Sequence, residues 1–328
     1  MSQKVLITGG SGFLGYHLIM AALEKKMEVY AAVRGKSNVE HLKGLPVNFT
    51  TVNYEDSDAI QKQLSEKKYD FIIHAAGITK ANSLASFDHI NATYTANLAL
   101  AAAQQNGQVK RLVMISSLAA AGPLKDRNIL ITEQTQPNPV TAYGRSKLKA
   151  EQALANINIP STILRPTAIY GPRDKDLFLI SSYLQKGVDA YIGRLPQQLS
   201  FVHAQDVADA ALLALLVNNA NGIYNISDGS IYSRYDFADI AKKILEKKPR
   251  RIHLPVAVVR SILFFVEAIN KMGDKVPVVS REKLNELLAE NWGCDISRAK
   301  KELGFSPAYN LQSGLEETIG WYRKNNWL

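Results

Sequence analysis

Apolar residues in the first half of the chain alternate between two spacings. Short apolar runs with the length of buried strands occupy residues 4–8, 28–33, 47–52, 71–74, 111–116 and 161–165. Between them, apolar residues recur at the helical period and predict helices over 13–26, 56–67, 90–106 and 143–156. Strands that alternate with helices predict a parallel sheet covered on both faces. Right-handed crossovers then make this sheet doubly wound, of the Rossmann type.

The alternation of strand and helix patterns ends after Arg165, where prolines and glycines interrupt the chain up to residue 200. A helical pattern over 204–217 and a strand over 222–226 are expected to return to the sheet, and the pattern from Asp228 onward is helical. We therefore expect an α/β protein whose dinucleotide-binding domain comprises 1–170 and 201–227. Residues 171–200 and 228–328 then form a smaller, mainly helical substrate-binding domain over the carboxyl ends of the strands.

The composition is typical of a soluble globular protein, with 46% apolar and 21% charged residues in 328 positions. No apolar run reaches the roughly 18 residues that span a bilayer, and the N-terminus lacks the pattern of a secretory signal. One cysteine, Cys294, allows neither an internal disulfide nor a cysteine cluster, and the six histidines show no metal-binding spacing. We expect a cytoplasmic protein without a metal site.

Positive charge is concentrated in one stretch of the chain. Residues 240–283 contain eleven Lys/Arg and four Asp/Glu, a net charge of +7 within the +9 of the whole chain. A solvated face, an anionic lipid surface and nucleic acid are the three interpretations. Nucleic acid fits worst, because no aromatic residues interleave with these lysines to stack on bases.

The segment 255–271 lies inside this basic stretch and predicts a helix with a wide apolar face. Its polar residues Arg260, Glu267 and Lys271 share one narrow stripe. Burial in the second domain or a subunit interface would explain the pattern. So would a cover over a lipid-like substrate or a helix lying on a membrane, which would place the protein at the inner membrane surface.

A glycine-rich turn joins the first predicted strand to the first helix. Gly9, Gly12 and Gly15 form the pattern G-x-x-G-x-x-G at that junction. Glycine permits a tight turn and close approach of a pyrophosphate, and the following helix offers unpaired backbone N–H groups with a favourable dipole. The strand–turn–helix context makes the motif specific for a dinucleotide.

The end of the second strand indicates which dinucleotide. An acidic residue there would bind the 2′-hydroxyl of NAD, but the chain carries Arg34, Lys36 and Ser37 instead. Guanidinium, ammonium and hydroxyl groups suit a 2′-phosphate, so NADP(H) is favoured. NAD(H) stays open if Arg34 stacks on adenine and Lys36 is solvated.

A tyrosine and a lysine are placed for proton transfer. Tyr143 and Lys147 lie four residues apart on a predicted helix, so their side chains share one face. An ammonium group near a phenol favours its ionised form and lowers its pKa, which allows proton exchange with a carbonyl or alcohol oxygen. Ser116 and Ser117, at the end of the strand over 111–116, would face the same crevice.

The order of these motifs resembles the extended, epimerase/dehydratase-like branch of the short-chain dehydrogenase/reductase superfamily, over nearly the whole chain. The shared motifs are the glycine turn, residues 74–77, Ser117, Tyr143 with Lys147, residues 165–172 and residues 201–207. Dihydroflavonol reductases and 3β-hydroxysteroid dehydrogenases are the members that the chain resembles in character.

The resemblance implies a role for each matching residue. Tyr143 donates and accepts the proton, Lys147 holds the nicotinamide ribose, and Ser117, rather than Ser116, binds the substrate oxygen. Asn91 matches a structural or proton-relay asparagine. The implied cofactor contacts are Gly9, Gly12, Phe13, Leu14, Gly15, Arg34, Ser37, Asn53, Tyr54, Ala75, Ala76, Gly77, Tyr143, Lys147, Pro166, Thr167 and Ile169. Asn53 departs from the aspartate usual near adenine, which puts that contact in doubt.

The expected reaction is hydride transfer between a nicotinamide and a ketone or secondary alcohol. Residues 118–121 are Leu-Ala-Ala-Ala, where sugar dehydratases of this kind carry acids, so dehydration is disfavoured and a lipid-, steroid- or ceramide-like substrate is favoured. The main alternative is a nucleotide-sugar epimerase with tightly bound NAD, whose diphosphate site would need Arg173, Arg194 and Arg234. A cofactor-sensing regulator is a third hypothesis, which the intact Ser-Tyr-Lys set disfavours. The resemblance also implies a homodimer through the helices over 90–106 and 143–156.

Overall fold

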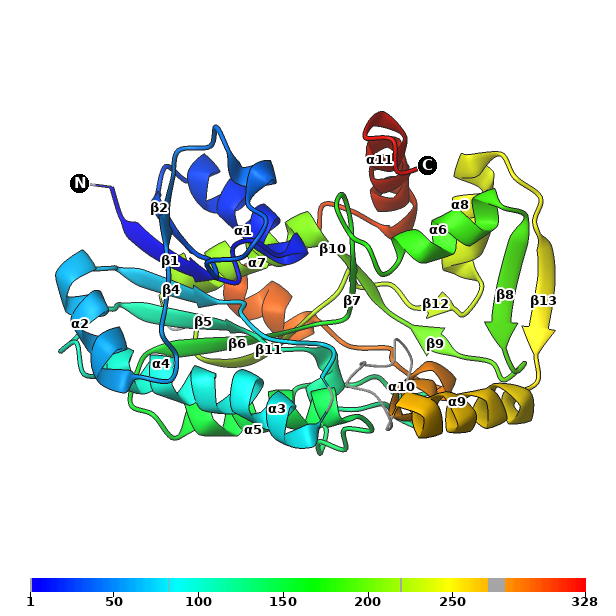
Figure 1. The fold of residues 1–328 in the computed structure, drawn as a ribbon, viewed down its shortest axis with the longest axis horizontal. Coiled ribbons are helices and arrows are strands. Elements are labelled where there is room, and N and C mark those ends of the chain that lie inside the picture. The colour runs from blue at the N-terminus through cyan, green and yellow to red at the C-terminus, as the bar shows by residue number, and fades with distance from the viewer. Residues whose placement is uncertain (1, 82, 219, 271–280) are drawn as a thin grey trace.

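Seven parallel strands form the central sheet of the protein (Figure 1). The computed structural model describes residues 2–81, 83–218, 220–270 and 281–328. The strands of the sheet are β1 (Lys4–Thr8), β2 (Glu28–Ala32), β3 (Val47–Thr50), β4 (Phe71–His74), β5 (Arg111–Ile115), β6 (Ser161–Pro166) and β11 (Gly222–Ile226). Their order is β11-β6-β5-β4-β1-β2-β3. The chain reverses its direction of travel across the sheet between β1 and β4, which is where such sheets bind ligands at their carboxyl ends.

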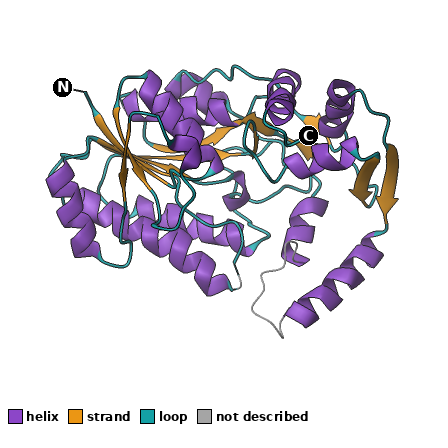
Figure 2. Ribbon diagram, turned by 45° about the horizontal axis from the view of Figure 1, so that its top comes forward, coloured by secondary structure: helices purple, strands orange, loops and turns teal. Residues whose placement is uncertain are grey.

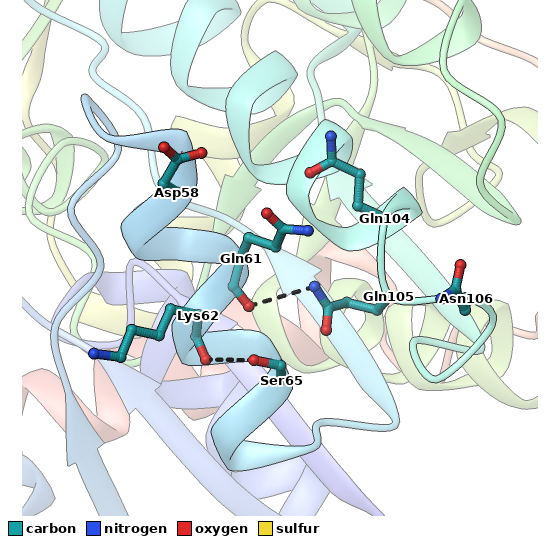
Figure 3. Close-up of a pocket in the computed structure, with 7 residues that line it drawn as sticks. All are labelled: Asp58, Gln61, Lys62, Ser65, Gln104, Gln105 and Asn106. Carbon is teal, nitrogen blue, oxygen red and sulfur yellow. Dashed lines mark hydrogen bonds between the residues drawn. The ribbon is translucent and has the colours of Figure 1, made fainter.

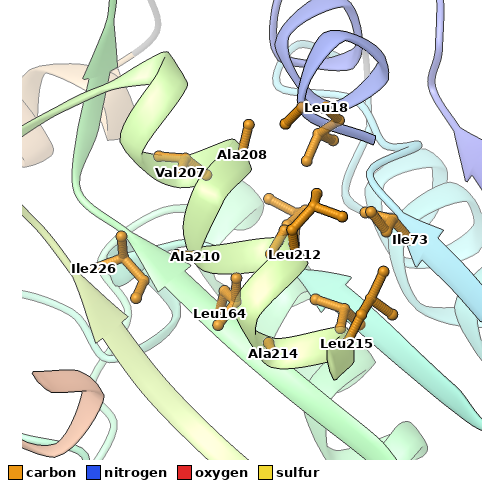
Figure 4. Close-up of a cluster of buried hydrophobic side chains, with 14 of the residues drawn as sticks. Leu18, Ile73, Leu164, Val207, Ala208, Ala210, Leu212, Ala214, Leu215 and Ile226 are labelled. Atoms are coloured by element: carbon orange, nitrogen blue, oxygen red, sulfur yellow. The ribbon is translucent and has the colours of Figure 1, made fainter. Parts of the chain in front are cut away.

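Helices cover both faces of the sheet, as the alternating pattern predicted. One face carries α1 (Phe13–Glu24) and α7 (Ala204–Leu216), and the other carries α2 (Ser57–Lys67), α4 (Tyr94–Ala103) and α5 (Ala142–Ala155). Successive side chains of a strand point to opposite faces. In β1, Val5 and Ile7 therefore pack in the core beneath α1 and α7, while Leu6 packs in the core of the opposite face. Figure 4 shows Leu212 and its neighbours on α7 gathered with Leu18, Ile73, Leu164 and Ile226.

The expected helix over 90–106 begins in a π-helical turn and ends at Ala103, and a short helix that the sequence pattern did not predict precedes it. A short helix α3 (Leu84–Asp88) runs into a π-helical turn at His89–Thr93, and α4 continues from Tyr94 to Ala103. The π turn adds one residue to the hydrogen-bonded ring and changes the direction of the side chains after it. This turn contains Asn91, which is buried.

A second region lies beyond the carboxyl ends of β6 and β11. Its helices are α6 (Phe178–Gln185), α8 (Asp236–Leu245), α9 (Val256–Asn270), α10 (Arg281–Leu288) and α11 (Leu311–Lys324). α6, α8 and α11 share a small core that includes Leu184, Ala241 and Ile319. The expected helix over 255–271 is observed as α9, and Lys271 lies outside the described residues.

Three short strand pairs join this second region together, and the sequence pattern did not predict them. They are β7 (Ala168–Tyr170) with β10 (Phe201–His203), β8 (Val188–Ile192) with β13 (Arg250–Leu254), and β9 (Gln198–Leu199) with β12 (Tyr232–Ser233). After β10 the chain returns through α7 and β11 to the main sheet, as predicted. Within the described residues, no helix is both long and apolar enough to cross a membrane.

Candidate active site

The turn between β1 and α1 requires its glycines. Gly9 has φ +72°, in the left-handed region that favours glycine, and a Cβ atom on Gly15 would lie 2.2 Å from the Gly9 carbonyl oxygen. The Gly12 amide closes the turn on that same carbonyl at 2.9 Å. Phe13 and Leu14 then begin α1, whose first turn contains no acidic residue. A glycine cradle leading into a helix N-terminus fits the pyrophosphate of a dinucleotide.

Beside this turn, Thr8 and His74 tie the ends of β1 and β4 together. The Thr8 hydroxyl accepts hydrogen bonds from the amides of Ala75 (3.1 Å) and Ala76 (3.0 Å) and lies 2.8 Å from His74 Nδ1. The Thr95 hydroxyl oxygen lies 3.0 Å from His74 Nε2, and this hydroxyl donates its proton to the Asn91 carbonyl. His74 Nε2 must therefore carry the ring proton, and Nδ1 accepts from Thr8.

Burial lowers the pKa of His74 to about 3, with a smaller contribution from the Lys147 charge. His74 is thus a neutral, hydrogen-bonded residue beneath the site. Among the described residues, no group of histidine, cysteine and acidic side chains is arranged to hold a metal ion.

The Asn91 side chain is fixed in place by hydrogen bonds. Its carboxamide oxygen accepts the Ile78 amide proton (2.8 Å), and its nitrogen donates to the Ile78 carbonyl (3.0 Å) and to the Ser146 hydroxyl (2.9 Å). Both N–H groups are therefore used. A Cβ atom on Gly77 would lie 2.9 Å from the Asn91 oxygen and 3.4 Å from Lys147 Nζ, so Gly77 lets the loop after β4 approach α5.

Tyr143 and Lys147 lie at the start of α5, as predicted. Thr141 caps this helix by accepting the Gly144 amide proton at 3.0 Å. Lys147 is buried, and its ammonium group donates to the Ile115 carbonyl at the end of β5 (2.9 Å). The spacing on α5 therefore places the phenol and the ammonium group beside the carboxyl edge of the sheet.

Burial shifts the pKa of both groups. It lowers the pKa of Lys147 to about 8, against the effect of the nearby Glu151 carboxylate. It raises the pKa of Tyr143 to about 12, a change that a hydrogen bond with Ser117 opposes and the Glu286 charge reinforces. Tyr143 is therefore a neutral phenol that can donate a proton, next to a serine hydroxyl. The expectation that Lys147 lowers the pKa of Tyr143 is wrong for this structure, because burial has the larger effect.

The structure distinguishes the two candidate serines. The Ser116 hydroxyl donates to the buried carboxylate of Glu151, which also accepts bonds from Nε and Nη2 of Arg165. Ser116 is therefore committed to a buried ion pair. Ser117 instead caps the short turn at Leu118–Ala120, accepts the Ala119 amide proton at 3.2 Å, and contacts Tyr143. Of the two serines, Ser117 is therefore the one whose hydroxyl lies at Tyr143.

The turn after Ser117 is apolar and packs closely on α5. Residues 118–121 are buried, and none of them carries an ionisable side chain. A Cβ atom on Gly144 would lie only 2.4 Å from the Ala119 carbonyl oxygen. This close contact holds Tyr143 next to Ser117.

The predicted adenosine contacts lie at the carboxyl ends of β2 and β3. Arg34 is exposed, and its carbonyl accepts the Ser37 amide proton at 2.8 Å in the turn that follows β2. Asn53 accepts the Glu55 amide proton at 3.3 Å. Tyr54 stacks on the ring of Tyr94 with a centroid distance of 5.1 Å. These groups share the sheet edge with the glycine turn, as a dinucleotide requires.

The remaining predicted cofactor contacts follow β6. Pro166 is the last residue of β6, Thr167 donates its amide proton to the Ile226 carbonyl (3.0 Å), and Ile169 lies in β7. The Thr167 hydroxyl oxygen is buried without a hydrogen-bond partner in the described structure. This segment therefore contributes backbone groups, apolar side chains and the Thr167 hydroxyl.

Two carboxylates near the site were missed by the sequence analysis. Glu282 of α10 accepts the Ala142 amide proton (2.6 Å) and a bond from Arg145 Nη2 (2.6 Å), so it caps α5 from the second region. Glu286 lies one turn later on α10 and raises the pKa of Tyr143. Nothing in the local sequence connects residues about 140 positions apart, so only the fold reveals this contact.

A shallow hollow between α2 and α4 lies outside the site (Figure 3). Its lining is polar and contains none of the predicted catalytic or cofactor-binding residues: Asp58, Gln61, Lys62, Ser65, Gln104, Gln105 and Asn106.

Known proteins resemble this chain over nearly its whole length. The model of the NAD dependent epimerase/dehydratase family matches residues 5–227. Ceramide reductase of Caulobacter vibrioides is 28% identical, over 99% of this chain and 96% of that protein. Sterol-4-alpha-carboxylate 3-dehydrogenase (decarboxylating) of Candida albicans is 26% identical, over 98% of both chains. Among solved structures, UDP-glucose 4-epimerase of Thermotoga maritima superimposes with a TM-score of 0.80 at 20% identity, over 99% of this chain and 100% of that chain.

Proposed function

The chain belongs to the NAD dependent epimerase/dehydratase family, in the extended short-chain dehydrogenase/reductase superfamily, and we propose that it reduces a ketone on a hydrophobic substrate. The observation that carries this proposal is the set of Ser117, neutral Tyr143 and buried Lys147 beside an apolar turn. The proposed reaction interconverts a ketone and a secondary alcohol.

A bound nicotinamide would supply the hydride, and the protein would supply geometry and proton transfer. Ser117 and Tyr143 would both hydrogen-bond the substrate oxygen and so position the carbonyl. Tyr143 would then give its proton to the oxygen as negative charge develops there. The raised pKa of Tyr143 keeps the phenol protonated at neutral pH, which suits the reductive direction.

Lys147 would support this step in two ways. Its ammonium group lies beside Gly77 and the Ile115 carbonyl, at the sheet edge where the nicotinamide ribose would bind. Its positive charge would also stabilise the tyrosinate left after proton transfer.

An apolar substrate is favoured by the lining of the site. The turn 118–121 provides leucine and alanine side chains and no acid or base, so it supports neither loss of water nor recognition of sugar hydroxyls. Two relatives act on apolar molecules by name, a ceramide reductase and a sterol carboxylate dehydrogenase. We propose a lipid-, steroid- or ceramide-like ketone.

The alternative of a nucleotide-sugar epimerase has less support in the structure. Two of the three arginines proposed for a diphosphate site already have internal contacts. Arg173 lies over the rings of Tyr16 (4.3 Å) and Trp321 (5.3 Å). Arg234 donates to the carbonyls of Leu195 (2.7 Å) and Ile192 (2.8 Å). Releasing either guanidinium for a diphosphate would cost these interactions.

We propose NADP(H) as the preferred cofactor, with NAD(H) as the alternative. Arg34 is exposed beside Ser37 at the end of β2, and no acidic residue stands between Ala32 and Asn38. An exposed guanidinium next to a hydroxyl suits a 2′-phosphate.

The test begins with the nucleotide carried by the purified protein. Mass spectrometry after denaturation should find no stoichiometric NAD, and turnover of hydrophobic ketones should then be faster with NADPH than with NADH. Stoichiometric, tightly held NAD would favour the epimerase instead. The variant Tyr143→Phe is the control for both assays, because it keeps the fold and removes the proton donor.

A further inference from the structure

Helix α9 presents apolar side chains to solvent. Val258, Ile262 and Phe264 are 49%, 56% and 54% exposed, whereas Leu263 on the inner side is 8% exposed. A helix of a globular protein normally buries its apolar face and exposes polar residues. Over its first nine residues, α9 exposes apolar residues on its outer side as well.

The apolar exposure continues onto the neighbouring segments. Leu254 at the end of β13 is 42% exposed, and Leu195 in the turn after β8 is 53% exposed. The turn touches the helix, because a Cβ atom on Gly193 would lie 2.9 Å from Val256 of α9. We call Leu195, Leu254, Val258, Ile262 and Phe264 the α9 surface. Figure 2 shows α9 at the edge of the molecule, away from the central sheet.

Two arginines flank the α9 surface. Arg194 adjoins Leu195, Arg260 lies on the helix itself, and both side chains are exposed. Residues 256–264 contain no acidic residue. An apolar strip flanked by cations matches an anionic phospholipid surface, which takes apolar side chains into its interface and attracts arginine to its headgroups.

The α9 surface is also connected to the active site. α10 packs against α9. Gln197, in the turn after β8, donates to the carbonyls of Leu287 (2.8 Å) and Ala289 (2.7 Å) and so holds the end of α10. At its other end, α10 reaches α5 through the bonds of Glu282 to Ala142 and Arg145. A membrane in contact with α9 would therefore lie next to the helix that adjoins Tyr143.

We propose that the α9 surface docks the protein on an anionic phospholipid membrane. The docking itself does not depend on the reaction that the protein catalyses. If the proposed function is also correct, docking places the active site where a lipid-like ketone is dissolved.

The experiment is flotation of the full-length protein with vesicles of phosphatidylcholine alone or with phosphatidylglycerol added. Binding should require the anionic lipid. Ile262→Glu should lower the partition coefficient at least tenfold. It removes an apolar side chain whose burial contributes about 1.5–3 kcal/mol, and it adds a negative charge that the anionic lipid repels. Arg260→Gln should lower it about fivefold, the factor for one cation near the surface.

Leu216→Glu is the matched control, because Leu216 is a 44% exposed leucine on α7, a helix of the dinucleotide-binding domain. This variant should bind vesicles like the wild type. Ile262→Glu should reduce a short water-soluble ketone as fast as the wild type, which separates docking from catalysis.

Absence of binding to anionic vesicles would overturn the proposal. A second outcome would also overturn it. If the wild type is a dimer in size-exclusion chromatography and Ile262→Glu makes it a monomer without changing vesicle binding, the α9 surface binds a second copy of the chain. Equal loss of binding in Leu216→Glu would also contradict it.

Discussion

Breaking the buried ion pair beneath the Ser117 turn on one side only is predicted to destabilise the dinucleotide-binding domain strongly. Glu151 of α5 and Arg165 of β6 are only 3% and 2% exposed, and the carboxylate accepts bonds from Arg165 Nε, Arg165 Nη2 and the Ser116 hydroxyl. Glu151→Gln keeps the size of the side chain but leaves the arginine charge buried without a counter-charge.

We expect Glu151→Gln to reduce the free energy of unfolding by about 3–5 kcal/mol, the usual cost of breaking a buried pair. Folded domains have a total of only about 5–15 kcal/mol, so the effect should be obvious in urea unfolding followed by circular dichroism. Glu282→Gln is the matched control, because it breaks a glutamate–arginine pair whose side chains are 44% and 38% exposed. That exposed pair should contribute no more than about 1 kcal/mol.

A double variant tests the physical cause. Glu151→Leu combined with Arg165→Met removes both charges and keeps the volume, so it should recover most of the stability that Glu151→Gln loses. The reasoning is refuted if Glu151→Gln costs no more than Glu282→Gln, or if the double variant is less stable than Glu151→Gln.

Three further predictions follow from the site. Gly15→Ala should abolish dinucleotide binding in isothermal titration, since its Cβ would lie 2.2 Å from the Gly9 carbonyl oxygen, and wild-type affinity would disprove the cradle. Tyr143→Phe should lower kcat about 10²- to 10⁴-fold with unchanged cofactor affinity, and a normal kcat would remove Tyr143 from the mechanism. The pKa of His74 is about 3 when folded and 6.5 when free, so the unfolded state alone binds this proton between those values. Stability should therefore fall as the pH is lowered from 6.5, by about 1.4 kcal/mol per pH unit, and His74→Asn should lessen that slope in urea titrations at pH 5 and 7. An identical slope in the variant would contradict the burial of a neutral His74.

Much of the architecture followed from the sequence because the signals are local. The alternation of apolar runs with helical periods depends only on neighbouring residues, so it predicted the seven strands of the sheet and the helices on both faces. The glycine turn and the four-residue spacing of Tyr143 and Lys147 are equally local. The resemblance to the extended short-chain dehydrogenase/reductase branch, carried by the order of these motifs, is confirmed by the family match.

The short strands of the second region were not predicted, because they depend on partners distant in the chain. β8 and β13 are five residues each and pair across more than fifty positions, and β9 and β12 are two residues each. Such segments become strands because a partner supplies hydrogen bonds, not because their own pattern favours extension.

By itself, therefore, the sequence determined the fold class, the glycine turn and the placement of Tyr143 and Lys147 on one helix face. Only the tertiary structure decided which groups are free to act. In the folded chain Ser116 is bonded to Glu151, whereas Ser117 lies beside Tyr143. Arg173 and Arg234 make internal contacts, and apolar residues of α9 are exposed to solvent. Burial and hydrogen-bond partners depend on residues distant in the chain, so no local pattern contains that information.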